Sequence, residues 1–253
     1  MVEVHNAIGA TRSRSSSYIL ATIPSAPSTA PVVVGSLTSS TQITVLLTAL
    51  SGDTETGGTA IISYGLQMSS NSADEAVAFE DVAGVLTDSL ALQHSIYGVQ
   101  RGLSYAFRYR AKNLYGWSDE WSTVTYAIPA DVPQAPPAPT FVEASDTSIT
   151  IDLYLPLDYG GQSLTSMELW RDDGEQAENP TFVQVTTYDS VGFSLQHVMT
   201  DALESLVTGK IYAFKTRASN PKGTSDFSDQ VQIAMASPPT SPAAPVADLE
   251  YSG

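Results

Sequence analysis

Hydrophobic and polar residues alternate with a period of two in many short runs along the chain. The runs 42–49 and 148–155 carry apolar side chains at every second position, and 105–110 does the same with tyrosine and phenylalanine. This period places one face of a β-strand toward a core. The runs recur about every 10 to 15 residues between Gly, Asp, Asn and Ser. No hydrophobic series is sustained at helical spacing, so the pattern predicts short β-strands throughout.

An internal repeat organises these strands. The segment GLSYAFRYRAKNLYG at 102–116 returns 107 residues later as GKIYAFKTRASNPKG at 209–223. The Asn and Gly near its end also stand 107 residues earlier, as Asn6 and Gly9. Tandem copies of one unit indicate an array of similar domains rather than one large fold.

Proline marks the joints between the copies. Twelve of the 15 prolines lie in the stretches 24–31, 129–139 and 238–245. Proline fixes φ and has no backbone donor, so these stretches predict semi-rigid linkers. The predicted parts are the C-terminal strands of a preceding unit at 1–24, full units at 30–129 and 138–237, and the first strand of a following unit at 245–253.

About seven strands in roughly 100 residues, with no cysteine, predict a β-sandwich of two antiparallel sheets. Val99-x-x-Gly102-x-x-Tyr105, which recurs as a similar pattern ending in Gly209 and Tyr212, resembles the sixth strand of fibronectin type III domains. The expected fold is therefore all-β, with tandem seven-stranded fibronectin type III (immunoglobulin-like) β-sandwiches joined by Pro-rich linkers. The resemblance implies a tyrosine corner at Tyr105 and Tyr212, whose hydroxyl groups bond to backbone a few residues upstream.

Two details refine this resemblance. Leu47 and Leu153 stand where the family has a tryptophan on the second strand, which predicts a smaller core residue. The Gly-Gly pair before the third strand and the Asp172-Asp173-Gly174 run after it resemble repeat-rich surface proteins of ciliates and other protists.

Composition excludes several classes of function. The chain has 11 basic and 27 acidic residues and a formal charge of −16, which argues against a basic nucleic-acid-binding face. The absence of cysteine removes disulfides, thiolate metal sites and cysteine nucleophiles. No apolar run approaches the roughly 18 residues of a membrane helix, so no membrane insertion is expected in this segment.

The histidines are the first candidates for catalysis. His94 and His197 occupy equivalent repeat positions, which favours strand residues over catalytic ones, and His5 lies in the partial copy. The nucleophile-elbow, phosphate-loop and zinc-protease motifs are all missing. The sequence therefore predicts no enzyme activity, no catalytic residue and no cofactor.

Acidic residues cluster at several points. Carboxylate clusters can bind calcium, but that ion needs six to eight converging oxygens, so solvated turns are favoured over weak surface calcium sites. No metal site is predicted. The clusters are Asp74-Glu75, Glu80-Asp81, Asp119-Glu120 and Asp172-Asp173 with Glu175.

Three aromatic residues follow the sixth strand of the first full unit: Tyr115, Trp117 and Trp121. They are candidates for a carbohydrate or protein contact. Packing of Trp121 at a domain junction is the alternative, and the sequence leaves both open. The same loop lacks Arg-Gly-Asp, so integrin binding is not implied, and the ligand is unknown.

The linkers offer candidate modification sites. Hydroxyl residues among prolines suit O-glycosylation if the protein is extracellular. No Asn-x-Ser/Thr sequon occurs, so any glycan is O-linked. The Pro-x-x-Pro spacings lack a basic anchor, which favours spacers over polyproline ligands. The candidate sites are Ser25, Ser28, Thr29, Ser237, Thr240 and Ser241.

Repetition without a differentiated pocket motif favours a non-catalytic structural or adhesive array, an excerpt of a longer extracellular or cell-surface filament or scaffold. Its expected partners are other protein modules or neighbouring copies, with O-linked glycans. Accessory spacer modules of a secreted carbohydrate-active enzyme are one alternative, and an intracellular cytoskeletal or ciliary array is another. Fold analogy does not choose among them.

Overall fold

The computed structural model describes residues 1–15, 20–70, 78–176, 178–239 and 241–242. Backbone contacts divide the chain into unit 1, Met1–Ala130, and unit 2, Asp131–Gly253. The strand expected at 245–253, the pair Asp74-Glu75 and the hydroxyl of Thr240 lie outside the described residues.

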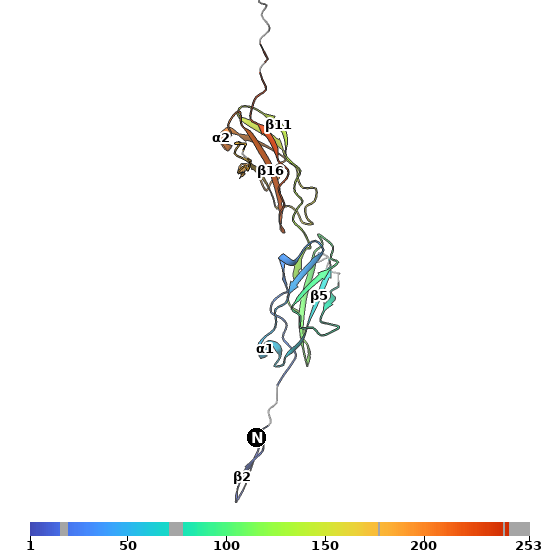
Figure 1. The fold of residues 1–253 in the computed structure, drawn as a ribbon. Helices are drawn as coiled ribbons and strands as arrows, with labels where there is room; N and C mark the ends of the chain where they lie inside the picture. Colours follow the sequence, from blue (N-terminus) through green and yellow to red (C-terminus); the bar gives the residue numbers. More distant parts are fainter. Residues whose placement is uncertain (16–19, 71–77, 177, 240, 243–253) are drawn as a thin grey trace, which may run out of the picture. The chain divides into compact units, whose positions relative to one another are not determined.

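The sandwich of unit 1 contains two antiparallel sheets, one of order β3-β4-β7 and one of order β10-β8-β5-β6, with β9 paired to the far end of β8. The long strand β5 is labelled in Figure 1. The strands are β3 (Val32–Val33), β4 (Gln42–Leu46), β5 (Ile61–Ser70), β6 (Glu80–Ala83), β7 (Gln93–Tyr97), β8 (Tyr105–Asn113), β9 (Gly116–Trp117) and β10 (Thr125–Ala127).

Unit 2 repeats this order. One sheet is β11-β12-β15, and in the other β16 pairs with β13 on one side and β18 on the other, while β14 extends β13. The strands are β11 (Thr140–Ala144), β12 (Ser148–Asp152), β13 (Ser166–Arg171), β14 (Val183–Gln184), β15 (Gln196–Thr200), β16 (Ile211–Asn220), β17 (Gly223–Thr224) and β18 (Val231–Ala234).

Each core lies between the two sheets of its unit and uses the side chains that the period-two pattern assigned to it. On β8 the side chains of Tyr105, Phe107 and Tyr109 are buried, while the alternating arginines are partly exposed. Leu47 and Leu153 are both buried, at the positions where a smaller core residue was expected. Burial of each such side chain stabilises a unit by about 1.5–3 kcal/mol.

Within the described ranges, three single helical turns interrupt the strands: η1 (Gly35–Leu37), α1 (Gly52–Thr56) and α2 (Asp201–Glu204). The hydrophobic pattern predicted no helices, because one turn is too short to create a periodic pattern. In α1 the Glu55 carboxylate accepts a hydrogen bond from the Ser51 amide at 2.7 Å, and Gly57 ends the helix with a φ of 70°.

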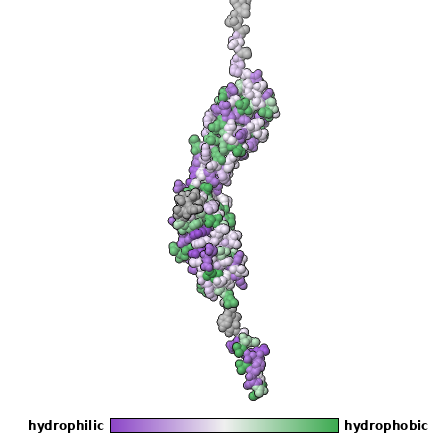
Figure 2. Space-filling model, turned by 180° about the vertical axis from the view of Figure 1, so that it is seen from behind, coloured by the Kyte–Doolittle hydropathy of each residue, from purple (hydrophilic) through white to green (hydrophobic). Residues whose placement is uncertain are grey.

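A separate two-stranded sheet lies near the amino terminus. It consists of β1 (Glu3–Asn6) and β2 (Gly9–Arg12), and every residue from 1 to 15 is exposed. On the face of both units seen in Figure 2, hydrophobic and hydrophilic residues are interspersed. The N-terminal hairpin therefore differs from the rest of the described chain in having no buried side of its own.

Candidate functional site

The two tyrosines of the repeat hold the loop before the sixth strand. The Tyr105 hydroxyl accepts a hydrogen bond from the Gln100 amide at 2.7 Å, and the Tyr212 hydroxyl accepts one from the Val207 amide at 2.8 Å. Both donors lie five residues upstream of the tyrosine. The same contact therefore fixes the crossover between sheets in both units.

The glycine three residues before each tyrosine ties this corner to the end of its unit. Gly102 and Gly209 have φ values of 78° and 87°, a conformation that favours glycine. The Gly102 amide donates to the Pro129 carbonyl at 2.9 Å, and the Gly209 amide donates to the Met235 carbonyl at 2.8 Å. The corner thus also anchors the chain that leaves the last strand.

A buried asparagine at the end of β8 clamps the start of unit 1. Asn113 is 0% exposed. Its amide nitrogen donates to the carbonyls of Thr22, at 2.7 Å, and Thr56, at 2.8 Å, while its oxygen accepts from the Tyr115 amide at 2.9 Å. One side chain therefore joins the entering chain, the turn after α1 and the turn after β8.

Unit 2 contains the same clamp at the equivalent position. Asn220 is 4% exposed, and its amide nitrogen donates to the carbonyls of Asp131 and Tyr159, both at 2.8 Å. Its oxygen accepts from the amides of Lys222, at 2.8 Å, and Gly223, at 3.2 Å. The recurrence of three backbone attachments makes the clamp a feature of the repeat.

The repeated Gly-Gly pair provides the surface on which the entering chain lies. Gly57 and Gly160 have φ values of 70° and 80°. A Cβ atom on Gly57 would lie 2.3 Å from the Thr22 carbonyl oxygen, and one on Gly160 would lie 2.1 Å from that of Asp131. The Thr22 and Asp131 amides in turn donate to the carbonyls of these two glycines at 2.9 Å.

The first two proline stretches, 24–31 and 129–139, are attached to the unit that follows each of them. Ser25 donates its amide to the Glu55 carbonyl at 3.0 Å, and Gln134 donates to Asp158 at 2.9 Å. Only Ala130 separates Pro129, which is bonded to unit 1, from Asp131, which is bonded to unit 2. Proline composition predicted semi-rigid linkers, and the structure shows backbone hydrogen bonds from Ser25 and Gln134 to the unit that follows each stretch.

The outward face of β8 carries a stack of alternating cations and aromatic rings. Successive cation-to-ring-centre distances along the stack are 3.9, 4.6, 4.4, 4.8 and 5.6 Å. Each contact of this kind contributes about 0.5–2 kcal/mol. In order, the members are Phe79, Arg108, Trp121, Arg110, Trp117 and Lys112.

Unit 2 has a shorter stack of the same type on β16. Its distances are 3.6, 4.2, 4.8 and 5.2 Å. Trp170 also meets Phe227 edge-to-face, with ring centroids 5.7 Å apart. In order, the members are Phe182, Lys215, Phe227, Arg217 and Trp170.

The two stacks differ in where their tryptophan originates. In unit 1 Trp117 comes from β9 and covers Gly65, where an added Cβ would lie 3.0 Å from the indole. In unit 2 the position facing the arginine is Glu168, whose carboxylate accepts from Arg217 at 2.7 Å and from the Trp170 indole at 2.8 Å. Unit 1 thus combines a glycine on β5 with a tryptophan from β9, whereas unit 2 combines a glutamate and a tryptophan that both lie on β13.

Stacking brings like charges together, and the pKa values reflect this. Burial, and then the neighbouring Arg110, lower the pKa of Arg108. Burial, and then Arg217, lower the pKa of Lys215. Gln67 partly offsets the cost in unit 1, because its side-chain oxygen accepts from Arg108 Nε at 3.0 Å and Nη2 at 2.8 Å.

These contacts bear on the aromatic candidates from the sequence. Trp117 and Trp121 stack on cations of β8 in their own unit and are only partly exposed. Tyr115 lies at the turn after β8 and is 54% exposed. The structure brings the two tryptophans together and leaves Tyr115 apart from the stack.

The candidate histidines lie on strands or in the N-terminal hairpin. His94 on β7 contacts the Ala91 carbonyl at 2.9 Å, and exposed His5 lies 3.7 Å from the Glu3 carboxylate. His197 on β15 lies 3.1 Å from the Thr187 hydroxyl, and burial lowers its pKa.

The contacts of His197 do not form a nucleophile and base. The Thr187 hydroxyl donates to the Glu204 carboxylate. The imidazole must therefore donate to the Thr187 oxygen at 3.1 Å, and a group that donates to a hydroxyl cannot take its proton. His197 also meets the Tyr188 ring edge-to-face, with centroids 5.6 Å apart. This arrangement anchors the loop before β15.

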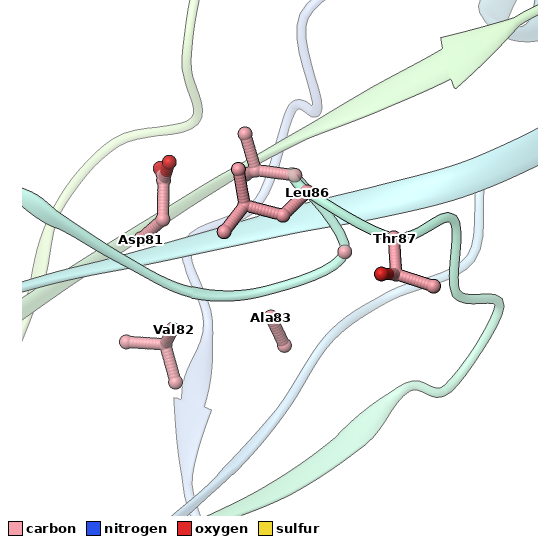
Figure 3. Close-up of a pocket in the computed structure, with 7 residues that line it drawn as sticks. Asp81, Val82, Ala83, Leu86 and Thr87 are labelled. Atoms are coloured by element: carbon pink, nitrogen blue, oxygen red, sulfur yellow. The ribbon is translucent and has the colours of Figure 1, made fainter.

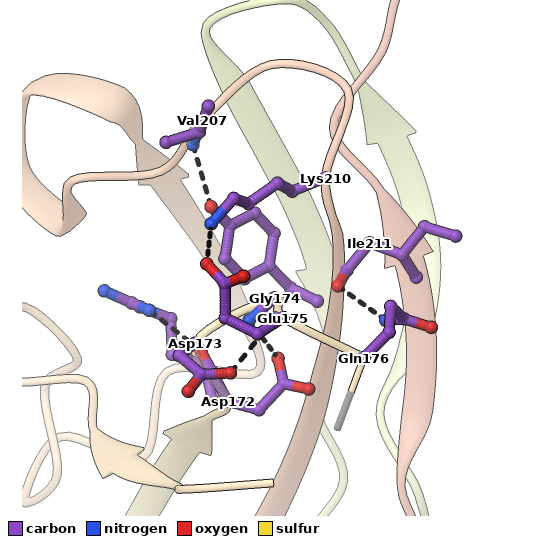
Figure 4. A network of polar contacts seen from close by, with 10 residues as sticks. Asp172, Asp173, Gly174, Glu175, Gln176, Val207, Lys210 and Ile211 are labelled. Atoms are coloured by element: carbon purple, nitrogen blue, oxygen red, sulfur yellow. Dashed lines mark hydrogen bonds and ion pairs between the residues drawn. The ribbon is translucent and has the colours of Figure 1, made fainter. Parts of the chain in front are cut away.

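Asp172, the first residue of the acidic run after β13, is structural, which corrects the interpretation as a solvated turn at this position, whereas Asp173 and Glu175 are exposed. Asp172 is only 2% exposed, and its carboxylate accepts from the Ala213 amide at 2.9 Å and the Gly174 amide at 3.2 Å. The Asp172 amide donates to the Ala213 carbonyl at 3.0 Å. Asp172 thus continues the pairing with β16 where β13 ends. Figure 4 shows the polar contacts around it, including those of Glu175 with Lys210 and of Gln176 with the Ile211 carbonyl.

The other candidate carboxylates either bond to separate partners or are exposed. Glu175 pairs with Lys210, Asp173 accepts from the Glu175 amide at 3.1 Å, and Asp81 accepts from Gln67 at 2.9 Å. Asp119 and Glu120 are exposed. Within the described ranges, no group of three His, Cys, Asp or Glu residues is arranged to hold a metal ion.

The pocket in Figure 3 is too small for most ligands. It has a volume of about 190 Å³ and is lined by residues 81–87, which are the end of β6 and the loop that follows it. Ligand sites usually occupy about 300–1,000 Å³ and draw polar groups from several elements. This pocket is a fold of one loop against β5, where the Gly84 backbone approaches Tyr64.

The candidate glycosylation sites are exposed where they are described. Ser25, Ser28, Thr29 and Ser241 lie on the surface, and the Ser237 hydroxyl donates to the Asp146 carboxylate. None of the helices in the described part of the chain has the length and hydrophobicity needed to span a bilayer.

Comparisons with known proteins add little beyond the fold. No family model matches the chain. The crystal structure of the FN1-FN3 domains of chicken CNTN1 aligns with 86% of this chain and 69% of that chain, at 15% sequence identity and a TM-score of 0.41. At that similarity the fold assignment rests on strand order, sheet pairing and the two corner tyrosines. By these features the chain contains two β-sandwiches in tandem, with the all-β fold that the resemblance to fibronectin type III domains implied.

Proposed function

We propose that the chain is a non-catalytic structural and adhesive module array of an extracellular or cell-surface filament or scaffold. The observation that carries this proposal is that three devices recur in both units and each closes on its own unit. They are the tyrosine corner, the asparagine clamp and the stack of cations and rings.

The contacts in the corners, clamps and stacks favour a structural role over a catalytic one. An enzyme site needs polar groups that converge on open space, with pKa values matched to proton transfer. In both units the buried polar side chains of the clamps end on backbone of the same unit, and the outward cations are covered by rings. Such units suit a role in which a domain must stay folded while its neighbours are displaced.

The exposed hydroxyls around the proline stretches fit the extracellular part of the proposal. Ser28 and Thr29 are exposed beside Pro27 and Pro31, whose side chains are buried. A glycan there would project from chain that is itself held to unit 1. O-linked glycans at the predicted sites would make the array a glycoprotein, with other modules or neighbouring copies as partners.

Surface labelling of native cells tests the location. Intact cells are treated with a membrane-impermeant amine reagent, and peptides containing Lys112, Lys210 or Lys222 are quantified with O-glycopeptides of the proline stretches. We expect labelling before lysis and hexosamine-containing masses on at least one stretch. A cytosolic protein in the same sample is the control. Labelling of the chain only after lysis would overturn the proposed location.

A further inference from the structure

A groove lies between β11 and β18 of unit 2, and we call it the edge groove. Its volume is about 400 Å³, within the range of about 300–1,000 Å³ that is typical of ligand sites. It is lined by Phe141 and Ala144 of β11 on one side, and by residues 232–234 and 236–238 of β18 and the chain after it on the other. The edge groove therefore belongs entirely to unit 2.

Phe141 lies on the core side of its strand, yet the core does not cover it. It pairs directly with Ile151, which is 0% exposed, and residues opposite each other in an antiparallel pair share one face of the sheet. Phe141 is nevertheless 56% exposed. In unit 1, Val33 pairs in the same way with buried Val45 and packs against the core. Unit 2 thus presents in the edge groove a large apolar side chain that its own core leaves uncovered.

Strand β18 supplies an open edge beside this groove. It pairs with β16 on one side, and no strand of the described chain pairs with it on the other. The Met235 amide donates to the Lys210 carbonyl, just before β16, at 2.9 Å. Backbone amides along an antiparallel strand point alternately to its two sides. The amides of Gln232 and Ala234 therefore point away from β16, toward the open side.

This edge lacks the features by which edge strands usually avoid pairing with other chains. Charged side chains, prolines and bulges on an edge strand hinder the addition of another strand. Residues 231–236 read VQIAMA, with neither a charge nor a proline, and the pairing of β18 with β16 has no register shift. Another strand thus meets no charge and no proline along β18.

The surroundings of the edge groove are acidic, although none of its lining residues is charged. On the β11 side, Glu143 and Asp146 are exposed, and the Asp146 carboxylate accepts a hydrogen bond from the lining residue Ser237. On the other side, Asp229 is exposed shortly before β18 begins. An apolar groove with carboxylates around it is complementary to apolar side chains accompanied by cations.

We propose that unit 2 binds an extended segment of another protein, which adds to β18 as a further strand. The segment places a bulky apolar side chain against Phe141 and carries lysine or arginine beside it. In strand addition, backbone hydrogen bonds give affinity and pockets for alternate side chains give specificity. A second copy of this chain lacks the required charge, because each copy has a formal charge of −16. The inference names a partner outside the array and does not depend on the proposed scaffold role.

Selection from a displayed library of random ten-residue peptides tests the inference. The full chain is the target, and its Phe141→Ala variant is the counter-target. We expect an enriched family with apolar residues at alternate positions and lysine or arginine beside them. The strongest peptide, made synthetically, should shift the amide resonances of β18 and β11. Its affinity for Phe141→Ala should be at least about tenfold lower, because burial of one large apolar side chain contributes about 1.5–3 kcal/mol.

Matched controls make the result specific. Leu157→Ala removes an apolar residue that is 88% exposed outside the edge groove, and it should leave the affinity unchanged. Two changes to the peptide leave the protein intact: glutamate in place of its lysines and arginines, and N-methylation of alternate backbone amides. Each should weaken binding at least about tenfold.

Four results would each overturn the proposal. They are the absence of a peptide family that depends on Phe141, enrichment of acidic peptides, resonance shifts confined to other strands, and dimers of the chain in sedimentation that Phe141→Ala abolishes. The last result would assign the edge groove to a second copy instead.

Discussion

Replacement of Asn113 by alanine removes the clamp of unit 1. The substitution eliminates hydrogen bonds of 2.7, 2.8 and 2.9 Å and leaves two carbonyls and one amide without their partner. Each lost bond costs about 1 kcal/mol, and more where the remaining group stays buried. We expect the free energy of unfolding of unit 1 to fall by about 3 kcal/mol and its Tm by about 12–24 °C.

The two units provide their own reference in this experiment. Urea unfolding is followed by hydrogen–deuterium exchange on peptides from each unit. Unit 2 should keep its midpoint, because its clamp uses Asn220. Asn6→Ala is the matched control, since the Asn6 side-chain oxygen accepts from amides of its own turn in the N-terminal hairpin, and it should change unit 1 by less than about 0.5 kcal/mol. A loss of less than about 0.5 kcal/mol for Asn113→Ala, or an equal loss in both units, would refute the reasoning.

Three further substitutions probe the other devices by urea unfolding. Asp172→Ala should destabilise unit 2 by about 2–4 kcal/mol, because two buried backbone amides lose their carboxylate acceptor. The control Asp173→Ala changes an exposed residue and should cost less than about 0.5 kcal/mol. Similar losses for the two variants would contradict the role of Asp172. Trp121→Ala breaks two cation–π contacts and should cost unit 1 about 1–3 kcal/mol, and an unchanged midpoint would exclude the stack as a stabilising element. Burial lowers the pKa of His197 below 6.5, so folded unit 2 binds fewer protons than the unfolded chain and its stability should fall as pH drops below 6.5. His197→Gln should reduce that pH dependence, and an identical pH profile would contradict the assignment.

The strands could be predicted because their signal is local. Alternation along one strand identified the buried residues of β8, and the repeat identified the tyrosines and the Gly-Gly pairs. The clamp was not predicted, although Asn113 was seen to recur. Its acceptors Thr22 and Thr56 lie 91 and 57 residues away in sequence, so only the folded chain brings them together.

The burial of polar side chains was harder to predict from the sequence than the strands. Asp172 sits in an acidic run that resembles an exposed turn, yet it is buried because it bonds to Ala213 of β16 beyond the last pair of β13. The stack on β8 left a partial signal, namely arginines at alternate positions followed by two tryptophans. In unit 2 that signal is weaker, because Trp170 lies on β13 and not in the turn after β16. Aligning the two repeats residue by residue does not reveal such contacts, because the tryptophan that covers the arginine lies on a different strand in each unit.

Mechanical unfolding of single molecules tests most directly whether the chain is an array of self-contained structural units. The full chain is stretched between attachment points at its two ends. Two separate unfolding events are predicted, each releasing roughly 350 Å of chain, since each unit holds about 100 residues that extend by about 3.5 Å each. Asn113→Ala should lower the force of one event only. A single event that releases both units together, or gradual extension without a peak, would contradict the account.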